Sequence, residues 1–309
     1  MGEAAKGVTA MVAACMIWGL SPLFYKLLAH IAPIEILAHR TLWSLAFFAG
    51  VLGAQRRLGE LARALGSVRA AVIIGFAALM ISTNWFIFIM SIQIGKATEA
   101  SMGYYLFPLV AVVIGMVAFA EKLGRAQAVA VGLAALAVTL LTWGLGVAPW
   151  IALVLSVSFG LYGLVKKNIS VGPVVSVTAE VLLLSPIALA VLWVMHSAAG
   201  GGAFSPGAAP GDSVLLMVSG VLTGTPLILF AYATRRVRMA TVGLVQYLNP
   251  TLQFFCAVVI FGEPFGRWHA GAFVLIWVAL AIYSTAALRA ERAARRARAS
   301  SAVVATGLR

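Results

Sequence analysis

Residues 105–125, YLFPLVAVVIGMVAFAEKLGR, return 142 positions later as residues 247–267, YLNPTLQFFCAVVIFGEPFGR. The identical positions include a tyrosine–leucine pair, a proline, a glutamate, a glycine and an arginine, all at the same offsets. A shared apolar composition alone would not place these residue types in register. The chain therefore contains an internal repeat.

Around this repeat, the sequence divides into ten long apolar segments. A helix needs about 20 mostly apolar residues to cross a bilayer, and on that rule we expect ten spans with short connections. They are predicted at residues 8–29, 33–54, 70–93, 97–119, 124–143, 148–166, 173–196, 213–233, 239–262 and 266–288. A shift of 141 also aligns Gly19, Leu20 and Lys26, in the first span, with Gly160, Leu161 and Lys167, in the sixth.

Each half of the chain thus contains five spans. Because five is odd, the second half must enter the membrane from the opposite side, as in the inverted repeats of many secondary transporters. We predict an all-α integral membrane protein with ten transmembrane helices in two inverted five-helix repeats. The repeats are assigned to residues 1–145 and 146–290, and a basic tail to residues 291–309.

Composition and charge agree with a membrane location. Hydrophobic residues make up 62% of the 309 and charged residues 10%, which excludes an ordinary soluble domain. Lysine and arginine gather at alternate connections, and the positive-inside rule then predicts that both termini are cytoplasmic. This asymmetry explains the net charge of +13 without nucleic acid. We predict that the tail arginines contact anionic lipid. The alternative is that they are solvated and only fix the orientation of the chain in the membrane.

Several short motifs spread over nearly the whole chain carry a family resemblance. They are Trp18-Gly19, Glu35-Ile36-Leu37-Ala38-His39-Arg40, Asn84-Trp85, Glu99-Ala100-Ser101, Tyr162-Gly163-Leu164-Val165 and Gln246-Tyr247. With these motifs the chain resembles the RarD-like branch of the EamA group in the drug/metabolite transporter superfamily. The resemblance implies a ten-helix carrier of the bacterial inner membrane with both ends cytoplasmic, and the wider superfamily suggests export.

Two equivalent prolines, Pro108 and Pro250, lie within their spans, where each removes a backbone hydrogen bond. We predict that they form a paired hinge facing the centre of the molecule. Tyr105 and Tyr247 lie three residues earlier on the same helix faces, with Ser101 one turn further back. We expect these faces to line a central substrate cavity, although tight helix packing is the alternative for Ser101.

Other side chains could add stacking surfaces and hydrogen-bond donors to this cavity. The candidates are Trp18, Asn84, Trp85, Phe159, Tyr162 and Gln246. The two amides are the better evidence, since buried amides require partners, whereas aromatic residues also gather at membrane interfaces.

Glu180 is the most informative charged residue. It lies about 12 Å into the seventh span at 1.5 Å per residue, and a charge at that depth is costly unless it is paired. We predict a proton-coupling carboxylate or an anchor for a substrate amino group, with a structural partnership to Ser158, Tyr162 or Asn84 as the alternative. For Glu121 and Glu263, which lie at the ends of their spans, we predict capping or loop contacts instead of a coupling role.

Near the outer surface, Lys26, Glu35, His39 and Arg40 flank the turn between the first two spans. Glu35 and His39 are one helical turn apart. We predict an outer gate or a funnel for an anionic substrate, and a Lys26–Glu35 salt bridge that fixes the hairpin is the alternative.

The functional prediction is a secondary transporter that exports small amphiphilic metabolites, such as amino acids, by alternating access, with proton exchange at Glu180 or facilitated diffusion. Nucleotide-loop, metal and hydrolase motifs are not found, and the cysteines are isolated in apolar runs. We therefore expect no cofactor, no metal and no enzyme activity. A lipid or lipid-carrier flippase on the same fold is the alternative, followed by an intramembrane enzyme. We expect a monomer or a homodimer.

Overall fold

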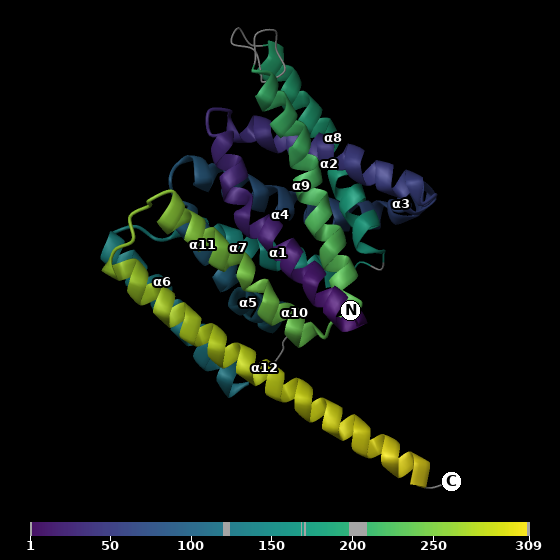
Figure 1. Ribbon diagram of the computed structural model, residues 1–309, viewed down its shortest axis with the longest axis vertical. Coiled ribbons are helices and arrows are strands. Elements are labelled where there is room, and N and C mark those ends of the chain that lie inside the picture. The colour runs from purple at the N-terminus through teal and green to yellow at the C-terminus, as the bar shows by residue number, and fades with distance from the viewer. Residues whose placement is uncertain (1, 120–123, 168, 170, 198–208, 308–309) are drawn as a thin grey trace.

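The computed structural model describes residues 2–119, 124–167, 169, 171–197 and 209–307 (Figure 1). It contains ten helical segments long and apolar enough to cross a membrane, which confirms the ten predicted spans. They are α1 (Glu3–Leu27), α2 (Pro33–Ala54), α4 (Val68–Gln93), α5 (Ala97–Phe119), α6 (Arg125–Leu145), α7 (Trp150–Lys167), α8 (Pro173–Ser197), α9 (Pro210–Thr234), a ninth segment in several pieces, and α12 (Arg267–Gly307). Large apolar side chains such as Val117, Trp143 and Trp193 are exposed on the outside, as expected of a protein surrounded by lipid.

The two repeats pack closely against each other. The main helix pairs in the core are α5 with α7, α6 with α12, α2 with α8 and α9, and α1 with α9. The contact of α12 with α6 can be followed in Figure 1, where the two helices run side by side. In every pair one helix comes from the first five spans and the other from the last five. The repeats therefore form one body, and the space between them lies inside the molecule.

The contact of α9 with α2 depends on two glycines. Gly220 faces the backbone of Trp43, and Gly224 faces the ring of Phe47. Small residues of this kind allow helix backbones to approach closely in a membrane. This glycine face is used for packing within the chain.

The ninth span is divided, whereas its counterpart in the first repeat is continuous. The divided span consists of α10 (Met239–Gln246), α11 (Leu248–Phe255) and the π-helical segment η1 (Cys256–Ile260). Pro250 has no N–H group, so it cannot donate a hydrogen bond to the carbonyl of Gln246, four residues earlier. The helix is interrupted directly after Gln246. In contrast, α5 continues through Pro108 as a single helix.

Two elements lie outside the predicted spans. The connection after α2 contains a short helix, α3 (Leu58–Ala64), where hydrogen bonds from Arg57 lower the pKa of the Glu60 carboxyl. The predicted tail is helical as well, because α12 continues beyond its apolar part to Gly307 (Figure 1). The alanine- and arginine-rich composition of this segment favours a helix.

Glu263 connects the two repeats at one end of the bundle. Its carboxylate is buried and accepts hydrogen bonds from the backbone N–H groups of Ala97 and Thr98, each at 2.7 Å. These groups begin α5, where N–H groups lack partners within the helix. The expected capping contact is therefore present, and it is made across the repeats. The equivalent Glu121 lies outside the described residues.

Candidate functional site

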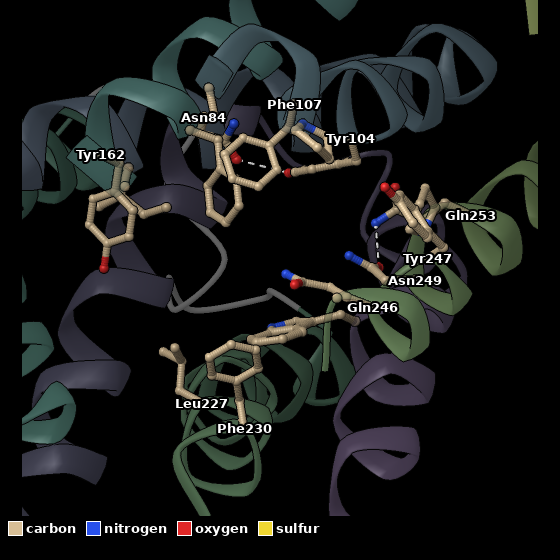
Figure 2. A pocket seen from close by; sticks show the side chains of 18 of the residues that line it. Asn84, Tyr104, Phe107, Tyr162, Leu227, Phe230, Gln246, Tyr247, Asn249 and Gln253 are labelled. Atoms are coloured by element: carbon tan, nitrogen blue, oxygen red, sulfur yellow. Dashed lines mark hydrogen bonds between the residues drawn. The ribbon is translucent and has the colours of Figure 1, made fainter. Parts of the chain in front are cut away.

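A cavity of about 830 Å³ lies between the two repeats. Among the described residues, every membrane-crossing helix except α6 contributes to its wall. Figure 2 looks into the cavity and shows Asn84, Tyr104, Phe107 and Tyr162 on one side, and Leu227, Phe230, Gln246, Tyr247 and Asn249 on the other. A volume in this range and a mostly apolar wall with a few polar groups are typical of small-molecule sites.

Seven of the nine residues predicted for the cavity line it: Trp18, Asn84, Trp85, Phe159, Tyr162, Gln246 and Tyr247. Both predicted hinge prolines, Pro108 and Pro250, line it too. Their role as hinges remains a prediction.

The structure places Ser101 and Tyr105 away from the cavity, contrary to the prediction. Ser101 is fully buried and donates a hydrogen bond to the Thr98 carbonyl. The Tyr105 hydroxyl lies 2.6 Å from Thr251 Oγ1, and its ring packs against Phe273. Successive helical residues point about 100° apart, so Tyr104 faces the cavity in place of Tyr105. The prediction selects Tyr105 because the repeat aligns it with Tyr247, but an alignment does not fix the rotation of α5 about its axis.

Asn84 organises the wall formed by α4, α5 and α7. Its amide donates to the Leu155 carbonyl at 2.9 Å and to Ser158 Oγ at 3.2 Å, and its oxygen accepts from the Tyr104 hydroxyl at 2.8 Å. The last of these bonds is drawn in Figure 2. These contacts satisfy the buried amide and fix the position of the Tyr104 ring.

The opposite wall carries polar side chains from the divided span. Gln253 donates to the side-chain oxygen of Asn249 at 3.0 Å, while Gln246 projects into the cavity (Figure 2). At spacings of three and four residues these three amides share one face of the span, and all three line the cavity. An aromatic layer, including Phe107 against Phe159 with ring centroids 4.7 Å apart, faces them.

Arg40, predicted for an outer gate, lines the cavity instead. Its side chain is only 6% exposed, and its guanidinium lies over the Trp85 ring with 4.1 Å to the centroid. Its Nη1 donates to the Tyr25 hydroxyl at 2.8 Å. Arg40 is therefore a cation held by aromatic residues in the wall of the cavity.

The other three residues predicted for the gate do not line the cavity. The Lys26 ammonium lies over the Phe261 ring. Glu35 and His39 meet His196 of α8, and one potential ligand atom from each lies within 4.8 Å of the others. No sequence pattern marked His196, because only the contact of α2 with α8 brings it to this cluster.

Glu180 lies directly behind the cavity wall. It is 1% exposed, and its carboxylate accepts hydrogen bonds from Lys166, Ser176 and Tyr162, at 2.5, 3.0 and 3.2 Å. Tyr162 was among its expected partners, whereas Lys166, the last residue of the predicted sixth span, was not. Lys166 and Tyr162 both line the cavity, so Glu180 contacts the site through them.

Ten membrane-crossing helices in two repeats around a central cavity define a multi-pass membrane protein with the architecture of a repeat-based carrier. The sequence model that defines the EamA-like transporter family matches the chain twice, over residues 5–143 and 147–285. The chain belongs to this family.

Its relatives span almost the same length. Protein RarD of Streptomyces exfoliatus is 43% identical over 281 residues, which cover 90% of this chain and 88% of the relative. The uncharacterized transporter YojE of Bacillus subtilis (strain 168) is 37% identical, with 95% and 98% covered. Protein RarD of Escherichia coli (strain K12) is 35% identical, with 93% and 96% covered. A crystal structure with 16% sequence identity shares the fold, with a TM-score of 0.59 over 92% of this chain and 97% of the other.

Proposed function

We propose that the chain is a secondary carrier that exports small amphiphilic solutes across the bacterial inner membrane by alternating access of its two repeats. The cavity of about 830 Å³ between the repeats carries this proposal. Aromatic rings on one wall and amides on the other fit a solute with an apolar body and a few polar groups.

The different conformations of the equivalent spans support alternating access. The span that contains Pro250 is interrupted, whereas α5 continues through Pro108. In an inverted repeat, access to the opposite side of the membrane results when the two halves exchange conformations. In the second state we therefore expect the break at Pro108 and a straighter ninth span.

The Glu180–Lys166 pair offers a route for proton coupling. A proton taken up by Glu180 would neutralise the carboxylate and weaken its attraction for the Lys166 ammonium. Lys166 already lines the cavity, so its release would change the charge that a bound solute meets. Protonation and solute binding would then depend on each other, as linkage requires.

Flux in proteoliposomes tests both the carrier and the coupling. The assay uses labelled amino acids and small metabolites, with and without a pH gradient. We expect the wild type to move at least one solute faster under the gradient, and Glu180→Gln to lose this stimulation because glutamine carries no transferable proton.

A double variant, Glu180→Gln with Lys166→Met, removes the unpaired buried lysine and should also lack the stimulation. Glu60→Gln, which alters an exposed ion pair, is the matched control and should behave as wild type. Equal gradient responses in the wild type and in Glu180→Gln would contradict the coupling. Failure of every solute to move would contradict the small-solute carrier and favour lipid-linked substrates.

The distribution of basic residues supports cytoplasmic termini, with the basic end of α12 against anionic lipid of the inner leaflet. Reporter fusions test this topology in cells. We expect alkaline phosphatase to be inactive when fused after Gly307 and active when fused after Ala209. The reverse pattern would contradict the orientation.

A further inference from the structure

Arg40 has far fewer hydrogen-bond acceptors than its guanidinium can use. A guanidinium presents five N–H groups. In the described part of the chain, Nη1 donates to Tyr25 and Nε is buried without an acceptor. The Trp85 ring covers the guanidinium at 4.1 Å, which leaves the edges of the group as the places where further acceptors can bind.

No carboxylate balances this charge within the residues that the structure describes. The described residues that line the cavity include no aspartate or glutamate. The described acids are engaged elsewhere: Glu3 with Lys6 and Arg236, Glu60 with Arg57, Glu99 with Lys96, Glu180 with Lys166, Asp212 with His30, and Glu263 with the backbone of Ala97 and Thr98. Glu35 lies in the cluster with His39 and His196.

Burial of a charge without a counter-ion is costly, because the ion loses its hydration. Contact with aromatic rings offsets only part of this cost. The remaining stabilisation must come from water or from an anion that enters the cavity. Arginine is suited to the second role, because its planar N–H groups match the paired oxygens of carboxylates and phosphates.

We infer that Arg40 is the anchor for an oxyanion group, a carboxylate or a phosphate, on the solute that occupies the cavity. This inference rests on the proposed carrier function and names its substrate class: small amphiphilic anions. The apolar body of such a solute would pack against the cavity-lining rings of Trp85, Phe88, Tyr104 and Phe107.

Equilibrium binding to the purified full-length chain in detergent tests the inference independently of transport. The probes are phenylacetate and phenylacetamide, which have the same ring and differ in charge. Phenyl phosphate is added as a second oxyanion, and dihexanoyl phosphatidate represents a lipid headgroup. Quenching of tryptophan fluorescence provides the readout, since Trp18 and Trp85 line the cavity.

We expect phenylacetate to bind at least about tenfold more tightly than phenylacetamide, the factor that corresponds to a hydrogen-bonded ion pair. Arg40→Gln should remove this preference and leave the affinity for the amide unchanged. Arg40→Lys should keep part of it, because lysine retains the charge without the planar geometry. Arg236→Gln removes an arginine that stacks on Tyr232 at 3.6 Å outside the cavity lining, and it should keep the full preference.

Equal affinities of the wild type for acid and amide would overturn the inference, and so would a preference that survives in Arg40→Gln. If Arg40→Gln does not fold, Arg40→Lys supplies the second variant, and a preference as large as that of the wild type would then overturn the inference. Tighter binding of phosphatidate than of both small anions would overturn the assignment to a small solute.

The binding and flux experiments separate the two proposals. Anion preference without flux of any solute would sustain the site and contradict the carrier. Flux of solutes without anion preference would sustain the carrier and contradict the role of Arg40.

Discussion

Gly220→Ala is expected to prevent α9 from packing on α2. A methyl group at this position would overlap the Trp43 carbonyl carbon and lie 2.5 Å from its oxygen and 2.8 Å from the Ser44 nitrogen. These are backbone atoms of α2, so the clash can be relieved only if the helices move apart. Alanine otherwise favours a helix by roughly 0.5–1 kcal/mol over glycine, but overpacking of a tight core costs about 1–3 kcal/mol or more.

We therefore expect a lower thermal midpoint and a reduced yield of folded protein, measured by intrinsic fluorescence during heating in detergent and by size exclusion. Gly132→Ala in α6 is the matched control, since no atom lies within 4 Å of the position its methyl group would occupy. That variant should be as stable as the wild type or slightly more stable. Similar midpoints for both variants would show that α9 does not depend on close approach at Gly220.

Glu263→Ala is expected to destabilise the connection between the repeats. It removes two charge-assisted hydrogen bonds of 2.7 Å at the start of α5 and leaves two N–H groups without partners. Bonds to a charged group contribute about 1.5–3 kcal/mol each, so the expected loss is about 3 kcal/mol or more. The thermal midpoint in detergent measures this effect.

Two further variants separate the charge and hydrogen bonds of Glu263 from general effects of removing an acid. Glu263→Gln retains one acceptor oxygen and should lie between the wild type and Glu263→Ala. Glu60→Ala removes a partly exposed acid from an i,i+3 pair with Arg57, and surface pairs of this kind contribute only about 0.2–1 kcal/mol. A drop in Glu263→Ala no larger than that in Glu60→Ala would contradict the capping role.

The outcome for Arg40 and Glu180 shows why the site was only partly predictable. The sequence was sufficient to predict that Glu180 is buried within an apolar span and has a partner, because an isolated charge at that depth is costly. The partner itself, Lys166, lies near the end of α7, and only the arrangement of the consecutive helices α7 and α8 in the folded chain brings its ammonium to the Glu180 carboxylate. Arg40 lies close to a predicted turn in the sequence, yet the tilt and packing of α2 direct its side chain into the cavity.

The sequence by itself determined the membrane class, the ten spans and the repeat, because each depends on local apolar length or on direct comparison of segments. Periodicity along one helix also marked the face of the ninth span that includes Tyr247 and Pro250, both of which line the cavity. The rotation of α5, which presents Tyr104 and not Tyr105, was decided by the tertiary structure. The tertiary structure also decided the placement of Arg40 in the cavity wall, where no carboxylate among the described residues pairs with it. The physical reason is that in a nearly uniformly apolar chain every face of a helix is compatible with lipid, so contacts between distant helices select the faces that point inward.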